Sequence, residues 1–156
     1  MSESTARAPR LVAIAYISAS VLPPTPAQLD ALLLDAREFN ASVGVTGVLL
    51  HNDGTFFQYI EGPDDGIARV YDRIRRSHLH AGIVELFNAR ERTRQFEQWH
   101  MGFCEAPRTT LQALTDSAWR ATYESLSERP TRSAGLDLLH SYLASADNPG
   151  EPAVHP

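Results

Sequence analysis

The chain has little of what several familiar classes of protein require. Its 156 residues include one cysteine, Cys104, which excludes an internal disulfide framework and a four-thiolate metal site. The net charge is −5, from 14 basic and 19 acidic residues, whereas a general nucleic-acid binder needs a positive field. No apolar run approaches the ~20 residues that cross a bilayer. We therefore expect neither nucleic acid nor a membrane as a partner.

Common catalytic and metal-binding motifs are missing as well. The sequence holds no G-x-G-x-x-G and no P-loop, and its six histidines form no His-x-x-x-His pair beside a carboxylate. Cys104 has no evident base partner, so we interpret it as a small packed residue. Residues 1–10 lack an apolar signal core, so we expect a cytoplasmic protein. The sequence thus predicts no metal site and no hydrolase.

Hydrophobic residues nevertheless make up 43% of the chain, enough for the core of one domain. We expect residues 1–10 to be a flexible leader and residues 147–156 a flexible tail. Asn52-Asp53-Gly54 predicts a hairpin turn, because these residues tolerate positive φ. Short β-branched or alternating runs predict five strands, at residues 11–18, 45–51, 55–61, 83–89 and 96–103.

Apolar residues at helical spacing predict four helices, and polar residues at the starts of the first three predict how those helices are capped. The first helix begins with a capping box of Thr25 and Gln28. The second begins at residues 64–65, whose aspartates can cap it. The third begins with a capping box of Thr109 and Gln112. The four helices cover about residues 26–42, 64 to near 79–82, 109–128 and 135–144.

The order of these elements predicts an α+β fold. It is the βαββαβ pattern of the ferredoxin-like fold with an added fifth strand. Parallel crossovers are right-handed, so the first two helices should cover one sheet face. The C-terminal helices carry an apolar stripe that includes Leu111, Leu114, Trp119 and Tyr123. We expect this stripe to cover the other sheet face, with a dimer surface as the alternative.

Three polar residues fall where the pattern is otherwise apolar. The pleat places Gln58 on one face with Phe56 and Ile60, and a buried amide must satisfy its donors and its acceptor. Tyr16, in the first strand, needs a partner for its hydroxyl in the same way. Asn40 lies at the end of the first helix, where it could turn inward. The alternative is that Gln58 lies at an edge and Tyr16 is an ordinary core residue.

These residues stand in motifs that resemble the BLUF domain, a flavin-binding sensor of blue light. Tyr16 and Asn40 lie 24 residues apart, and Asn40 and Gln58 lie 18 apart, which fits the family. The resemblance covers residues 11–105 and implies the same ferredoxin-like fold. The motifs read Tyr16-Ile17-Ser18, Asn40 followed by GVTGVL at 44–49, GTFFQYIEG at 54–62 and FEQWHMGF at 96–103.

The resemblance implies a role for each matching residue. FAD would lie between the first two helices, with Tyr16 as electron and proton donor to the excited ring. Gln58 would bridge the Tyr16 hydroxyl and the N5/O4 edge of the flavin, and Asn40 would hold its O4/N3 edge. Trp99 and Met101, on the last strand near Gln58, would pass the signal outward.

Around the polar part of the cofactor the sequence partly departs from the family. Arg73 matches a position that contacts this part in some members. Phe39, Ser77 and Leu79 stand where other members carry polar or charged residues, and His78 could compensate as a further cofactor contact. FMN or riboflavin could therefore take the place of FAD.

The resemblance implies a short photoreceptor and not an enzyme. Residues 11–105 would be the sensor domain, and residues 106–146 a helical cap or output segment too small for an effector enzyme. The signal would pass to an unidentified partner protein, and a homodimer is also expected. The alternatives are a ferredoxin-like enzyme or small-ligand binder that uses the same cleft without light, and an interaction module with an empty cleft.

Overall fold

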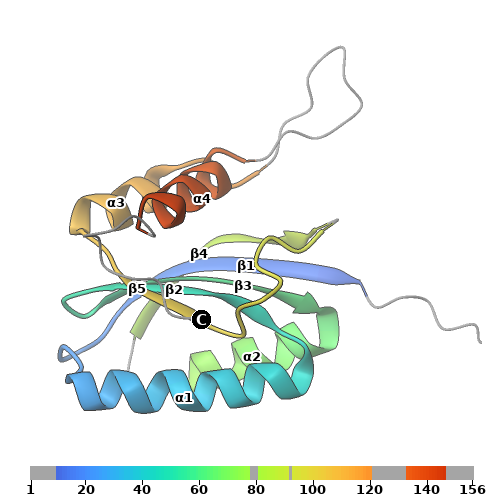
Figure 1. The fold of residues 1–156 in the computed structure, drawn as a ribbon, viewed down its shortest axis with the longest axis horizontal. Coiled ribbons are helices and arrows are strands. Elements are labelled where there is room, and N and C mark those ends of the chain that lie inside the picture. The colour runs from blue at the N-terminus through green and yellow to red at the C-terminus, as the bar shows by residue number, and fades with distance from the viewer. Residues whose placement is uncertain (1–9, 78–80, 92, 121–132, 147–156) are drawn as a thin grey trace, which may run out of the picture.

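The computed structural model describes residues 10–77, 81–91, 93–120 and 133–146. These residues form five strands and four helices (Figure 1). No helix among them has the length and apolarity that a membrane crossing needs. In chain order the elements are β1 (Leu11–Ala19), α1 (Pro26–Val43), β2 (Thr46–Asn52), β3 (Thr55–Pro63), α2 (Asp64–Arg76), β4 (Ala81–Arg90), β5 (Gly102–Glu105), α3 (Arg108–Asp116) and α4 (Ala134–Ala146).

The strands form one sheet in the order β4-β1-β3-β2-β5. Neighbouring strands are antiparallel except β2 and β5, which run parallel. The first four strands with α1 and α2 have the ferredoxin-like arrangement, and β5 extends the sheet beside β2. This confirms the predicted fold class. Helices α1 and α2 cover one face of the sheet, and α3 and α4 cover the other (Figure 1).

Local sequence signals place α1 and the β2–β3 hairpin as predicted. Thr25 Oγ1 accepts from the backbone amide of Gln28 at 3.1 Å, and Gln28 Oε1 accepts from that of Thr25 at 2.8 Å, which completes the capping box. Gly44 ends α1 in the left-handed conformation. Asp53 and Gly54 form the hairpin turn with φ values of 44° and 88°. These signals set the ends of α1 and the pairing of β2 with β3.

Two hydrophobic cores lie on the two faces of the sheet, because alternate residues of a strand point to opposite sides. Phe56 and Ile60 of β3 belong to the core under α1 and α2, whereas Phe57 and Tyr59 belong to the core under α3 and α4. Gln58 shares the first face and is buried, as the alternation predicts. We call the α1/α2 face the cleft side, and the α3/α4 face the cap side.

The fifth strand is shorter than predicted, because β5 begins only at Gly102. The backbone amides of Gln95 and Phe96 both donate to the buried carboxylate of Glu61, at 2.6 Å, and are therefore not available to a strand ladder. The apolar side chains of residues 96–101 face two different layers: Phe96 and Trp99 pack in the cap-side core, and Met101 packs in the cleft-side core. The prediction of a strand over the whole segment is wrong, since these side chains are buried outside any strand.

Prolines, and not the predicted polar side chains, start α2 and α3. Pro63 and Pro107 occupy the N-cap positions, with φ values of −59° and −62°, and neither helix has a side-chain cap hydrogen bond. The aspartates at residues 64–65 lie in the first turn of α2, where their charge favours the helix dipole. The predicted capping box of Thr109 and Gln112 is wrong, because both residues already lie inside α3.

Helix α3 also ends much earlier than the predicted range of 109–128, after nine residues. The Trp119 indole Nε1 donates to the carbonyl oxygen of Leu114 at 2.9 Å, an acceptor that a continuing helix would give to a backbone amide. The Trp119 ring folds back onto the sheet and stacks on Phe57, with 5.5 Å between ring centroids. Tyr123, part of the predicted stripe, lies outside the described residues.

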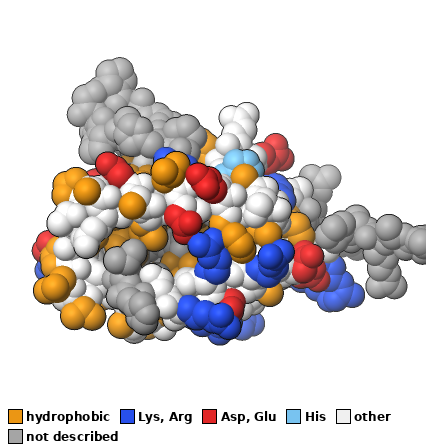
Figure 2. Space-filling view, turned by 90° about the horizontal axis from the view of Figure 1, so that it is seen from below, with side chains coloured by type: hydrophobic (Ala, Val, Ile, Leu, Met, Phe, Trp, Pro, Cys, Tyr) orange, Lys and Arg blue, Asp and Glu red, His pale blue; other side chains and the backbone are white. Residues whose placement is uncertain are grey.

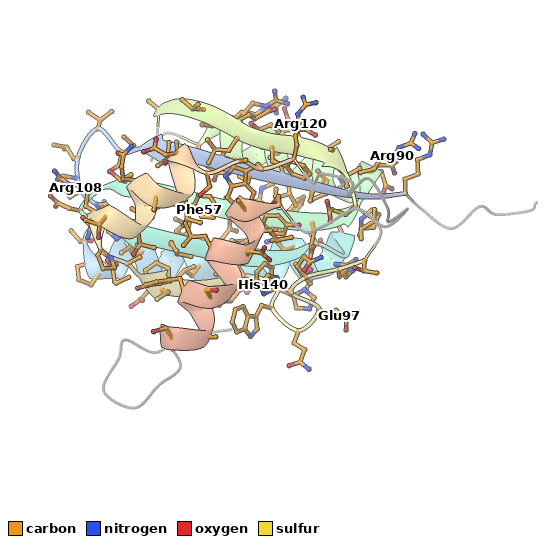
Figure 3. The ribbon with its side chains drawn as sticks, turned by 90° about the horizontal axis from the view of Figure 1, so that it is seen from above. Phe57, Arg90, Glu97, Arg108, Arg120 and His140 are labelled. Atoms are coloured by element: carbon orange, nitrogen blue, oxygen red, sulfur yellow. The ribbon has the colours of Figure 1, made fainter. Side chains whose placement is uncertain are left out.

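The cap formed by α3 and α4 covers the second sheet face with apolar side chains, which confirms the predicted cover. Leu114 and Leu139 are fully buried there. Figure 3 looks down onto the cap, with Phe57 beneath it. Gly135 lets α4 approach the Trp119 ring, since a Cβ at this position would lie 2.4 Å from Cε2 of the indole. The cap therefore shares a core with the sheet.

Leu139→Ala should lower the free energy of unfolding by about 2–5 kcal/mol, because it removes a side chain buried between cap and sheet. Leu34→Ala on α1 is the matched control, since Leu34 is 62% exposed. It should change the free energy by less than about 0.5 kcal/mol. Urea unfolding followed by circular dichroism measures both values. Equal values for the two variants would contradict the packing of the cap on the sheet.

Candidate functional site

A cleft of about 690 Å³ opens between α1, α2 and the cleft side of the sheet. This volume lies in the range of pockets that hold cofactors and other small molecules. Most of the lining is apolar, but Tyr16, Asn40 and Gln58 place three buried polar side chains in its wall. Arginine and acidic side chains lie close together on the outer surface of this side (Figure 2). The cleft therefore combines an apolar interior with a few polar groups.

Tyr16 of β1 and Gln58 of β3 are direct partners in the antiparallel register, and both line the cleft. The Tyr16 hydroxyl donates to Gln58 Oε1. On the other side of the amide, Gln58 Nε2 donates to Sδ of Met101 at 3.2 Å. The exposed fractions of Tyr16, Gln58 and Met101 are 1%, 6% and 0%. Three residues from distant parts of the chain thus form one buried row, and the edge alternative for Gln58 is wrong.

Asn40 points inward from the last turns of α1, as its position predicts, and is 2% exposed. Its Nδ2 donates to the carbonyl oxygen of His100 at 2.7 Å. This bond ties the first helix to the segment that precedes β5. A primary amide nitrogen has two hydrogens, so Asn40 can hold a second acceptor in the cleft as well.

Arg73 of α2 lines the more open part of the cleft, where it bridges to α1. Its guanidinium pairs with Asp35 at 2.7 Å and lies 4.0 Å from the centroid of the Phe39 ring. The Arg73 and Asp35 side chains are 43% and 66% exposed, so the ion pair adds little to stability. Phe39, the apolar departure from the family pattern, thus serves as a platform for Arg73.

Helix α2 ends at Arg76, before the predicted limit at residues 79–82. Ser77 has an extended backbone and its amide donates to the carbonyl of Ile74, which closes the helix with a tighter turn. Ser77 also lines the cleft. His78, predicted to contact the cofactor, and Leu79 lie outside the described residues.

Trp99 and Met101 lie on opposite sides of the sheet, which corrects the prediction that both lie near Gln58 on the last strand. Met101 belongs to the cleft-side core, and Trp99 packs against the cap-side core, 6.0 Å from the ring of Phe96. Residues two apart share a face in a strand, but the backbone bends at residues 100 and 101, before β5 begins.

Comparison with known proteins identifies the family of the domain that contains Tyr16, Gln58 and Met101. A family model described as "Sensors of blue-light using FAD", abbreviated BLUF, matches residues 11–102, more than half of the chain. The chain belongs to the BLUF family. The matched range includes every residue predicted for the site, from Tyr16 to Met101.

Similar proteins carry their BLUF-like segments in much longer chains. Photoactivated adenylate cyclase subunit beta from Euglena gracilis is 35% identical over 79 residues, which are 51% of this chain and 9% of that protein. The blue light- and temperature-regulated antirepressor BluF from Escherichia coli (strain K12) is 36% identical over 59 residues, 38% of this chain and 15% of that protein. The chain therefore matches only a small part of these relatives.

Solved BLUF structures share the fold. The dark-state structure of the BLUF protein BlrB has a TM-score of 0.60 at 29% identity, covering 68% of this chain and 79% of that chain. The BLUF domain of BlrP1 has a TM-score of 0.53 at 32% identity, covering 59% and 62%. These similarities agree with the ferredoxin-type sheet described above.

Glu61 is a buried residue of this BLUF domain that the sequence did not single out. It lies on the cap side of β3 and is fully buried. Besides the amides of Gln95 and Phe96, its carboxylate accepts from the Tyr59 hydroxyl at 3.3 Å. Burial raises the pKa of the Glu61 carboxyl, although the two amides oppose the rise. Its partners lie more than 30 residues away in the chain, and nothing in the sequence spacing indicated them.

The phenols near the cleft stay protonated. Burial raises the pKa of the Tyr16 hydroxyl, with a smaller contribution from Tyr71. Burial also raises the pKa of Tyr71 to about 12, together with its hydrogen bond to Glu85. Tyr16 is therefore a neutral hydrogen-bond donor at physiological pH. A neutral phenol that loses an electron becomes strongly acidic, and loss of its proton is then favoured.

Glu61→Gln should remove part of the pH dependence of stability. Because the folded-state pKa of Glu61 lies above its ordinary 4.5, the unfolded state loses this proton first as the pH rises. The wild-type free energy of unfolding should then fall between pH 4.5 and the folded-state pKa, by about 1.4 kcal/mol for each unit of the rise. Glu61→Gln has no carboxyl to ionise and should not show this fall.

Urea unfolding at several pH values measures the difference between the wild type and Glu61→Gln. Glu97→Gln removes an exposed carboxylate next to Phe96, whose amide Glu61 binds, and is the matched control for the change in net charge. A wild-type stability that rises relative to Glu61→Gln over this pH range would contradict the raised pKa.

Proposed function

We propose that this BLUF domain binds a flavin in the cleft between α1 and α2 and responds to blue light. The observation that carries the proposal is the buried hydrogen bond from the Tyr16 hydroxyl to Gln58 Oε1 in the wall of the cleft. It joins a phenol that can give up an electron and a proton to an amide whose two ends can exchange roles as donor and acceptor.

The residues present fit a flavin ring system. The cleft volume of about 690 Å³ is adequate for three fused rings, and side chains such as Leu33 and Val70 give it an apolar lining. Asn40 and Gln58 would bind the polar edge of the ring. The amide Nε2 of Gln58 is bonded to a thioether, which is a weak acceptor. A stronger acceptor in the cleft would satisfy this buried donor better.

A flavin that has absorbed blue light supplies a strong oxidant. Under this proposal Tyr16 would give up one electron and its hydroxyl proton to the flavin. Gln58, which accepts the Tyr16 hydrogen bond at Oε1, would relay the proton by taking it on Oε1 and releasing one from Nε2. Return of the electron and the proton to Tyr16 then restores its phenol. The amide of Gln58 remains rearranged, so that the change is one of hydrogen bonding and not of composition.

Gln58 suits this part because its side chain can invert a hydrogen-bond pattern without changing its charge. An ionised glutamate would add a buried charge with a large desolvation cost. A leucine has neither donor nor acceptor. The amide can rotate or tautomerise in place, between Tyr16 on one side and Met101 on the other.

We propose FAD as the flavin, following the description of the family, with FMN and riboflavin as alternatives. All three contain the ring that Tyr16, Asn40 and Gln58 would contact. They differ beyond the ribityl chain, where Arg73 and His78 are the proposed contacts. Arg73 is already paired with an aspartate in this structure, so a phosphate has to compete for its guanidinium.

We further propose that the chain is a cytoplasmic sensor and not an enzyme, and that it signals to a partner protein. Residues 11–105 would sense light, and residues 106–146 would carry the output surface, in a homodimer. Trp99 and Met101 are the proposed relay. Their positions on opposite sides of the sheet support this role, because a shift at Met101 can reach the cap through the segment that carries Trp99.

Gln58→Leu should bind flavin but lose the light response, because leucine has no polar atoms to rearrange. Absorption spectra of the purified proteins before and after blue light test this directly. The wild type should show a small, reversible red shift of the flavin band. Gln112→Leu on α3, an exposed position, is the matched control and should behave like the wild type. A colourless wild type, or one without a shift, would point to the alternative of a ligand binder without photochemistry.

Tyr16→Phe should abolish the same shift, because it removes the proton donor and the most direct electron donor. It should also increase flavin fluorescence, since electron transfer from Tyr16 no longer competes with emission. Tyr71→Phe is the control, because Tyr71 lies 6.1 Å from the Tyr16 ring but does not line the cleft. A normal shift in Tyr16→Phe would contradict the proposed donor.

A further inference from the structure

The segment between β4 and β5 connects the two sides of the sheet. At its cap-side end, Phe96 packs in the cap-side core, and His140 of α4 bonds to Gln95 with 3.0 Å between His140 Nε2 and Gln95 Oε1. Figure 3 shows His140 on α4 beside this segment, which also carries Glu97. From there the chain passes to the cleft side, where it approaches α1 (Figure 1). The contacts that hold the cleft-side end of this segment therefore set the position of Met101.

Two side chains on one face of α1 hold that end. Asn40 Nδ2 donates to the carbonyl of His100 at 2.7 Å, and Arg37 Nε donates to the carbonyl of Met101 at 2.9 Å. Residues three apart on a helix are neighbours, and here they bind consecutive carbonyl groups. The bond from Arg37 comes from a charged donor, which makes it one of the stronger kinds of hydrogen bond.

The Arg37 bond acts on the residue that touches the Gln58 amide. The Met101 side chain is fully buried, and its Sδ lies 3.2 Å from Gln58 Nε2. Methionine has flexible side-chain torsions, so the sulfur stays near the amide only if the backbone of Met101 is fixed. Arg37 itself does not line the cleft, whereas Asn40 does. Arg37 can therefore hold Met101 without contacting a bound molecule.

We propose that Arg37 is a positioning residue, which holds the Met101 backbone so that its sulfur receives the Gln58 amide and thereby sets how fast the dark arrangement returns after light. This inference rests on the proposed photosensor function. After illumination, recovery requires the amide and the sulfur to meet again. A free Met101 backbone makes that encounter less frequent, so recovery slows.

Variants of Arg37 can separate the hydrogen bond from the charge. Gln places its Nε2 the same number of bonds from the backbone as the Nε of Arg, so Arg37→Gln keeps a donor in place and removes the charge. Arg37→Leu keeps an apolar stem without a donor. Arg37→Asn keeps the amide on a side chain that is one carbon shorter, and serves as a second donor-deficient variant should Arg37→Leu fail to fold.

The first measurement is the dark-recovery time of the flavin-bound 156-residue chain after blue light. Arg37→Leu and Arg37→Asn should slow recovery about fivefold, the factor that corresponds to one hydrogen bond, while the size of the red shift is kept. Arg37→Gln should stay within about twofold of the wild type. Arg108→Leu is the matched control, because Arg108 lies at the start of α3 on the cap side (Figure 3).

The second measurement reports on Met101 itself in the dark. The chain contains two methionines, Met1 and Met101, so methyl-labelled methionine gives few and assignable NMR signals. The Met101 methyl signal should move in Arg37→Leu and Arg37→Asn and stay in place in Arg37→Gln. A role in stability alone would lower the melting temperature without moving this signal.

Unchanged recovery and an unmoved Met101 signal in the donor-deficient variants would overturn the inference. Equal slowing in Arg37→Gln and Arg37→Leu would overturn it too, since the charge would then be responsible. A wild type without any light-induced shift would instead refute the proposed function, and this inference with it. The two failures are thus distinguished by the wild-type spectrum.

Discussion

The site depends on one buried hydrogen bond, from the Tyr16 hydroxyl to Gln58 Oε1. The antiparallel register of β1 and β3 brings the two residues together, and the alternation of β3 directs Gln58 into the cleft. Neither group could stay buried alone without a substantial cost, because an unpaired buried polar group loses about 1–3 kcal/mol. The sheet pairing, the two helices over the cleft and the packing of Met101 all serve to hold this contact away from water.

Both faces of the sheet are covered by helices, and the segment between β4 and β5 runs from one face to the other. On the cap side, Glu61 holds this segment through the amides of Gln95 and Phe96. On the cleft side, Arg37 and Asn40 hold it through consecutive carbonyls. Side chains thus hold both ends of this segment, and one backbone hydrogen bond, from the Gly47 amide of β2 to the Trp99 carbonyl at 2.8 Å, ties it to the sheet. Side-chain anchors permit a segment to shift without breaking the sheet, which suits a connection between sensor and cap.

The sequence predicted those features that depend on local pattern. The capping box at Thr25, the turn at Asp53-Gly54 and the placement of Gln58 on the cleft face each follow from residue type and spacing. It could not predict features that depend on contacts between distant residues. The apolar residues at 96, 99 and 101 suggested a strand, but they are buried on two different sides of the sheet. Only the folded chain shows that the Glu61 carboxylate takes the amides of that segment.

The partner of the Gln58 amide nitrogen is a thioether, and this weak acceptor affects how easily the amide could change its orientation. A two-state element responds to a trigger only if its two arrangements differ little in free energy. Were a carboxylate or a carbonyl to accept from Gln58 Nε2, rotation of the amide would break a strong bond and place two acceptors against each other. Met101 Sδ is a weak acceptor, so rotation loses little on that side. On the other side the Tyr16 hydroxyl can accept as well as donate, so it can bond to either end of the amide. In the proposed photosensor, the protein's own contacts would therefore leave the two amide arrangements close in energy, and the bound flavin would decide between them.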